Sequence, residues 1–182
     1  MPRVPMITMR DQLAEGQRHN YDLIAASRGQ ASGPFAVLLN SPEVAGRVGH
    51  LGTYLRFEGV LPAADRELAI ITTAREFDCA VEWAGHVRLA REAGVRQEAV
   101  DVVAHRRPVI GLTEQEAVVV RYCRELLRDH KVSAPTFETT KARYGVQGVT
   151  EMTATIGYYG MLACALNAFE VEPAAGAERL PA

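Results

Sequence analysis

Helix start signals recur along this chain of 182 residues, and no stretch alternates polar and apolar side chains with a period of two. Ser41-Pro42-Glu43 combines a hydroxyl cap, a proline at the first helical position and an acid in the first turn. Thr113 and Glu116 have the spacing of a capping box. Because half-buried strands need the missing alternation, the sequence predicts an all-α fold, a bundle built from helical hairpins.

The helix signals also predict where the helices begin and end. Asp78 is expected to cap a helix that carries Cys79 in its first turn, after a break at Phe77-Asp78. We expect a single domain over residues 1–182, with an extended arm over about residues 1–14 and a loose tail over about residues 172–182. The expected helices cover residues 15–28, 41–57, 61–77, 78–94, 97–105, 113–130, 133–144 and 148–169, and a short apolar piece covers 35–39.

The charge balance excludes some classes of partner. The formal net charge of −2 and the pI near 6.2 give no electrostatic reason to expect binding to nucleic acid or to an anionic membrane.

Three cysteines cannot all pair within the chain, and no signal-peptide pattern opens it. We therefore expect a cytoplasmic protein with reduced thiols.

The uncharged run from Met152 to Phe169 approaches the length of a membrane span. It contains threonines, tyrosines, glycines and an asparagine, and Glu151 and Glu170 flank it. These residues favour a helix buried in a protein core over a membrane helix. Residues 150–170 also align without gaps on residues 66–86, so that Glu151 matches Glu67, which leaves an internal duplication open.

The residues with the most chemistry lie together in the sequence. Cys79, Glu82 and His86 occupy positions i, i+3 and i+7 of one expected helix, so they share a face. A thiol, a carboxylate and an imidazole on one face can transfer protons, attack an electrophile or bind a metal. The alternative for each is structural: a buried core cysteine and a surface ion pair.

Each residue of this face has an expected role. The helix N-terminus would favour the thiolate of Cys79. Glu82 would fix the tautomer of His86 and make it a better proton carrier. The break at Phe77-Asp78 would fold this helix back against Glu67, which would then supply a second carboxylate. The structural alternative is that Glu67 is a first-turn acid that satisfies backbone donors at the start of its helix.

The remaining reactive side chains are predicted to be structural or solvated. His19, His50, His105 and His130 have charged neighbours and are expected at the surface. Cys123 and Cys164 are expected in the core, and Tyr158 and Tyr159 are expected to pack, although Tyr158 could line a pocket. The sequence has no phosphate-binding glycine loop, no Gly-x-Ser-x-Gly, no Cys-x-x-Cys and no His-Glu-x-x-His.

The stretch RELAIITTAREFDCAVEWAGHVRLAREAGV, residues 66–95, resembles the carboxymuconolactone decarboxylase family, which includes the alkylhydroperoxidase D type of protein. The similarity extends over about residues 35–172 and implies the alkylhydroperoxidase D-like helical fold. Glu67, Cys79 and His86 match the Glu-x11-Cys-x2-Cys-x3-His pattern of the peroxidase branch, but Glu82 replaces the second cysteine. That departure removes the resolving partner that a dithiol peroxidase cycle needs.

The decarboxylase branch of the family implies another chemistry. Loss of CO2 beside an unsaturated lactone leaves a dienolate, which His86 would protonate, with Glu82 orienting it and Glu67 completing a proton relay. Cys79 would bind substrate or be a remnant. Arg66 or Arg75 would anchor substrate carboxylates. The resemblance also implies a closed homo-oligomer, a trimer or hexamer.

These observations lead to four hypotheses. The first is a lyase or isomerase that needs no cofactor and uses acid–base chemistry on a small carboxylated lactone or ring-fission product. The second is a thiol peroxidase that uses Cys79. The third is a metal-binding protein with Cys79, Glu82 and His86 as ligands. The fourth is a non-catalytic oligomeric scaffold, which would leave Glu67, Glu82 and His86 exposed.

Overall fold

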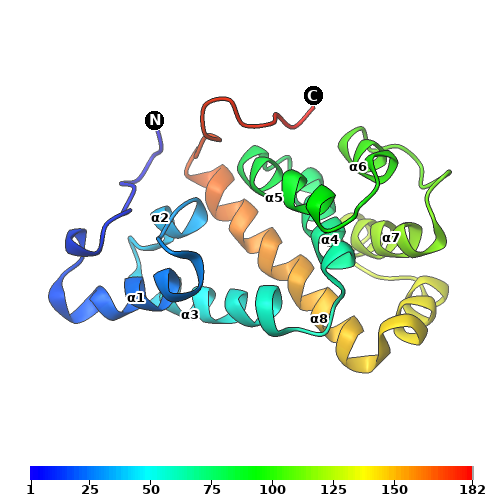
Figure 1. Cartoon of the computed structure of the whole chain (residues 1–182), viewed down its shortest axis with the longest axis horizontal. Helices are drawn as coiled ribbons and strands as arrows, with labels where there is room; N and C mark the ends of the chain where they lie inside the picture. Colours follow the sequence, from blue (N-terminus) through cyan, green and yellow to red (C-terminus); the bar gives the residue numbers. More distant parts are fainter. Residues whose placement is uncertain (182) are drawn as a thin grey trace. The chain divides into compact units, whose positions relative to one another are not determined.

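The computed structural model describes residues 1–181, and within them it holds helices, turns and loops but no strand. The all-α prediction is confirmed. A π-helical segment, Tyr54–Glu58, continues α3. The helices are α1 (Arg18–Arg28), α2 (Pro34–Leu38), α3 (Pro42–Thr53), α4 (Ala63–Glu76), α5 (Ala80–Glu92), α6 (Gln97–Ala104), α7 (Glu114–Arg128) and α8 (Ala134–Ala168) (Figure 1).

The chain forms two compact units. Unit 1 contains residues 1–59 and 162–172, and unit 2 contains residues 60–161 and the segment from Pro173 onward. Helix α8 contributes to both. The prediction of a single domain stays a prediction.

Unit 1 is built on the contact between α1 and α3. Ile24 and Phe35 are buried in its core, together with Leu13 from the N-terminal arm. The helices approach closely at Gly49, where a Cβ atom would lie 2.8 Å from Cγ1 of Ile24. The arm is held in place by backbone bonds, including the one from the Ile7 amide to the Ala36 carbonyl at 2.8 Å.

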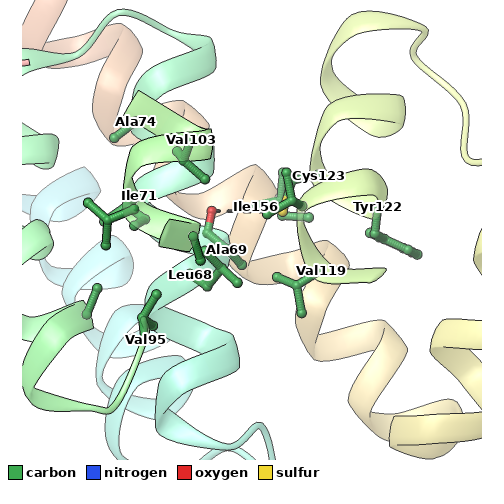
Figure 2. Packing of buried hydrophobic residues seen from close by; sticks show 14 of the residues in the cluster. Leu68, Ala69, Ile71, Ala74, Val95, Val103, Val119, Tyr122, Cys123 and Ile156 are labelled. Atoms are coloured by element: carbon green, nitrogen blue, oxygen red, sulfur yellow. Dashed lines mark hydrogen bonds between the residues drawn. The ribbon is translucent and has the colours of Figure 1, made fainter. Parts of the chain in front are cut away.

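Unit 2 is organised around α4, which packs against α5, α6 and α7. Figure 2 shows the core between three helices, with Leu68 and Ala69 from α4, Val119 and Cys123 from α7, and Ile156 from α8. The thiol of Cys123 lies 3.9 Å from the Ala69 carbonyl oxygen, and burial raises the pKa of Cys123. Cys123 is therefore a core residue, as predicted.

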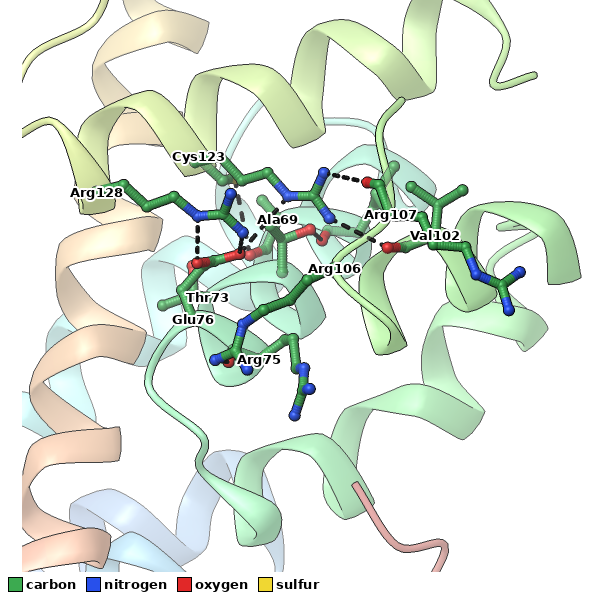
Figure 3. A network of polar contacts seen from close by, with 12 residues as sticks. Ala69, Thr73, Arg75, Glu76, Val102, Arg106, Arg107, Cys123 and Arg128 are labelled. Carbon is green, nitrogen blue, oxygen red and sulfur yellow. Dashed lines mark hydrogen bonds and ion pairs between the residues drawn. The ribbon is translucent and has the colours of Figure 1, made fainter. Parts of the chain in front are cut away.

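Ion pairs made by the buried side chain of Glu76 hold the C-terminal end of α4 (Figure 3). The Glu76 carboxylate accepts two hydrogen bonds from Arg128, at 2.6 and 2.7 Å, and lies 3.6 Å from Nε of Arg124. Arg124 also donates to the carbonyl oxygens of Arg107 and Val102. These contacts tie α7 and the end of α6 to the turn that leads into α5.

Two expected boundaries need correction, and one expected break is confirmed. Asp78 does not cap α5: it has a φ of 48° and closes α4, while Cys79 itself is the N-cap residue of α5. Helix α7 ends at Arg128, before the left-handed His130. The break expected between the helices over 133–144 and 148–169 is confirmed: it lies at Gly145, whose φ of 70° interrupts α8.

The C-terminal tail is anchored rather than loose. Glu178 forms two hydrogen bonds with Arg91 of α5, at 2.6 and 2.8 Å, and Leu180 packs against the core of unit 2. The Pro181 carbonyl accepts a hydrogen bond from Arg75 at 2.8 Å. The tail therefore runs beside α5 (Figure 1).

One face of the uncharged run in α8 is buried, with Met152 and Ile156 in the core of unit 2 and Leu166 in the part that belongs to unit 1. Over residues 1–181, no helix combines the length and apolar character that crossing a bilayer requires. The preference for a core helix over a membrane helix agrees with this finding.

Candidate active site

The fold-back of α5 on α4 brings His86 to Glu67. The imidazole Nδ1 lies 2.7 Å from Oε2 of Glu67, a hydrogen bond between side chains that are both buried. Glu67 lies in the second turn of α4 and His86 in the second turn of α5, and the Phe77–Cys79 turn makes the two helices neighbours. The predicted meeting of these residues is observed, and their catalytic role stays a prediction.

Glu82 approaches the other side of the imidazole. Its Oε2 lies 3.6 Å from Nε2 of His86, one helical turn away, and its side chain is 5% exposed. This distance is longer than a hydrogen bond and describes a charge contact. Removing two carboxylates and an imidazole from water costs free energy, so an arrangement of this kind favours a functional explanation.

Aromatic side chains of α8 close the site. The Tyr159 ring meets the His86 ring edge to face, with centroids 5.0 Å apart, and Tyr158 packs against Tyr159 in the same way. The sequence pointed to Tyr158 as a pocket residue but not to Tyr159. The rotation of α8 decides which tyrosine faces α5, and adjacent tyrosines in an apolar run do not reveal that rotation.

Cys79 begins α5 and is fully buried, one turn before Glu82. The N-terminus of a helix favours a thiolate, whereas burial opposes one, so the two effects act against each other at Cys79. Cys164, in contrast, was predicted to be a core residue and is exposed, because its position on α8 turns away from the buried face. All three cysteines are free thiols.

The structure also bears on the four other histidines and on the metal-binding and scaffold hypotheses. His19, His50, His105 and His130 are exposed, as predicted. Over residues 1–181, no group of three His, Cys, Asp or Glu side chains is arranged to hold a metal ion, so the metal-ligand interpretation of Cys79, Glu82 and His86 gains no support. The burial of Glu67, Glu82 and His86 contradicts the exposure that a scaffold predicts.

The two arginines expected to anchor a substrate differ. The Arg75 guanidinium is buried and donates to Asp78 and to the Pro181 carbonyl, so it is already engaged. Arg66 is half-buried and donates one long hydrogen bond, 3.4 Å, to the Leu61 carbonyl. Arg66 is therefore the better candidate of the two.

Comparison with known proteins relates this site to a family. Residues 42–125 match the model of the carboxymuconolactone decarboxylase family. This part of the chain is similar to that family. The matched segment contains all four candidate residues, namely Glu67, Cys79, Glu82 and His86. No curated protein matches the chain.

Solved structures share the fold. An alkylhydroperoxidase AhpD core protein from Ralstonia eutropha JMP134, an uncharacterized peroxidase-related protein, has a TM-score of 0.77 at 16% identity, covering 96% of this chain and 93% of that one. A peroxidase-related protein from Silicibacter sp. TM1040 has a TM-score of 0.73 at 13% identity, covering 96% and 94%.

A third structure is that of ATU0492 from Agrobacterium tumefaciens, a protein of unknown function that is described as an antioxidant defence protein AhpD. It has a TM-score of 0.65 at 18% identity, covering 76% of this chain and 95% of that one. At such identities the likeness concerns the fold alone, and it confirms the alkylhydroperoxidase D-like fold.

Proposed function

We propose that this protein is a lyase or isomerase that transfers protons to and from a small carboxylated lactone or ring-fission product. The observation that carries the proposal is the position of His86, whose two ring nitrogens each face a buried carboxylate, Glu67 at 2.7 Å and Glu82 at 3.6 Å. Such an imidazole can be held in one orientation while it gains and loses a proton.

In a decarboxylation, the bond between the lactone ring and its carboxylate breaks and CO2 leaves. The electron pair stays on the ring as a dienolate. His86 then delivers the proton on Nε2 to the ring carbon, while the Nδ1 proton remains in the hydrogen bond to Glu67. Glu82 stabilises the imidazolium before transfer, and a proton from solvent restores it. In an isomerisation, the same nitrogen would remove a proton at one carbon and return it at another.

The surroundings of the three cysteines favour this chemistry over a dithiol cycle. Glu82 occupies the position where the peroxidase pattern has its second cysteine. Cys123 is packed in the core with a raised pKa, which suppresses the thiolate that disulfide exchange requires. Cys164 belongs to unit 1 and is exposed.

The decisive experiment measures CO2 release and product formation from a panel of carboxylated lactones. His86→Gln should lower kcat by about 10²–10⁴-fold, the usual contribution of a general acid or base. Cys79→Ser should keep most of the activity. His105→Gln, which changes an exposed histidine, is the matched control. Activity that survives His86→Gln but is lost in Cys79→Ser would reject the proposal.

Cys79 supports a second candidate function, a peroxidase with a single reactive cysteine, because it lies at the N-terminus of α5. The thiolate would attack a hydroperoxide, giving a sulfenic acid and an alcohol. One external thiol would then form a mixed disulfide with release of water, and a second would restore Cys79. Trapping the sulfenic acid with dimedone after peroxide treatment tests this candidate, and unlabelled Cys79 would exclude it.

A further inference from the structure

The turn between α4 and α5 has the hydrogen bonds of a Schellman motif. The Cys79 amide donates to the Ala74 carbonyl at 2.8 Å, and the Asp78 amide donates to the Arg75 carbonyl at 3.1 Å. Asp78 occupies the left-handed position with a φ of 48°, where glycine is the usual residue. Since the backbone alone would favour glycine, the carboxylate of Asp78 needs a separate explanation.

That carboxylate joins two arginines. Its Oδ1 accepts a hydrogen bond from Arg75 Nη1 at 3.0 Å, and its Oδ2 accepts one from Arg106 Nη2 at 2.9 Å. Arg106 Nη2 also donates to the Arg75 carbonyl at 2.8 Å, the same oxygen that accepts the Asp78 amide. We call Arg75, Asp78 and Arg106 the Asp78 clamp; Figure 3 shows both arginines at this end of α4.

The clamp is more than a surface ion pair. The Asp78 side chain is 62% exposed, and pairs made by exposed carboxylates contribute little to stability. Arg75, however, is buried, and a buried guanidinium needs a counter-charge. Glu76 is already paired with two arginines of α7, so Asp78 supplies the carboxylate that Arg75 and Arg106 share.

The position of the clamp links it to the candidate active site. Cys79 is at once the last residue of the Schellman motif and the N-cap of α5, so this turn sets the direction in which α5 leaves α4. His86 lies two turns along α5 and must reach Glu67 on α4 to form its 2.7 Å hydrogen bond. A small rotation at the turn would move both Cys79 and the imidazole.

We infer that the Asp78 clamp is a positioning device: it holds α5 at the angle that places Cys79 at its start and keeps His86 hydrogen-bonded to Glu67. Its three members are positioning residues, since their hydrogen bonds run to one another and to the Pro181 carbonyl. The consequence for turnover rests on the proposed function; the consequence for the geometry does not.

Asp78→Gly separates positioning from folding, because glycine suits the left-handed backbone and removes only the carboxylate. The readouts are kcat and KM with an active lactone, the rate of Cys79 alkylation, and the ¹⁵N NMR signals of the His86 ring. We expect kcat to fall about 10-fold with KM unchanged, since displacements below 1 Å already slow a reaction. Loss of the counter-charge of Arg75 should lower the urea midpoint. The His86 signals and the alkylation rate should change in solutions where the variant is still fully folded.

Arg106→Ala should reproduce the effects of Asp78→Gly, and Arg106→Lys should restore part of the activity and of the His86 signal. Arg88→Ala is the control, because Arg88 forms an exposed ion pair with Glu92 on the same helix. If Asp78→Gly does not fold, the two Arg106 variants provide the test instead.

Unchanged kcat, His86 signals and alkylation rate in Asp78→Gly and Arg106→Ala would overturn the inference. If the wild-type protein turns over no lactone, the proposed function fails. The NMR and alkylation measurements then still decide whether the clamp positions the two side chains.

Discussion

At the scale of single residues, the hydrogen bond between Glu67 and His86 should control which ring nitrogen carries the proton. Glu67→Gln keeps the shape of the side chain but removes the charge, so Nδ1 loses its anionic acceptor. We expect kcat to fall about 10²-fold and the His86 tautomer to change in long-range ¹H–¹⁵N spectra. Glu82→Gln is the comparison, because it leaves the Nδ1 contact in place. Wild-type spectra in Glu67→Gln would contradict this assignment.

Some residues of the candidate site could be predicted from the sequence and others could not. The spacing of Cys79, Glu82 and His86 fixes their shared face, because the helical period is local. The contact with Tyr159 depends on how α8 is rotated about its axis, which is set by packing. The left-handed backbone conformation of Asp78 could not be predicted either, because an aspartate before a helix ordinarily indicates an N-cap.

At the scale of one helix, the capping box of α7 formed as predicted, and Arg96 adds to it. Burial disfavours ionisation of Glu116, but hydrogen bonds from Arg96 and Thr113 outweigh burial and lower its pKa. This contribution to stability is therefore present above the ordinary glutamate pKa and is lost as pH falls through the lowered value. Glu116→Gln should cost about 1 kcal/mol at neutral pH.

Urea unfolding at neutral and at strongly acidic pH tests this prediction, because the cost of Glu116→Gln should vanish once wild-type Glu116 is protonated. Glu98→Gln is the control: its carboxylate is exposed and lies 3.8 Å from the same arginine. An equal loss of stability at both pH values would contradict the assigned charge effect. Helix α7 and the break in α8 at Gly145 were both predictable, because capping residues and glycine act on the local backbone.

At the scale of the whole molecule, the homo-oligomer implied by the family resemblance stays a prediction, and two exposed apolar side chains of α3 offer a way to test it. Val44 and Leu51 lie two turns apart on one face of this helix and are 46% and 47% exposed. We propose that this face of α3 contributes to a contact between subunits. The expected number of chains, three or six, comes from the family resemblance.

Light scattering after size-exclusion chromatography measures the mass directly, and we expect three or six times the 19.9 kDa of one chain. Val44→Asp combined with Leu51→Asp should dissociate the assembly, because each new carboxylate would have to leave water when the subunits meet. Glu92→Lys, which changes charge on the exposed face of α5, should leave the mass unchanged. A wild-type protein that runs at the mass of one chain would refute the assembly. Because His86, Glu67 and Glu82 all belong to unit 2, such a monomer would still present the three groups on which the proposed acid–base chemistry rests.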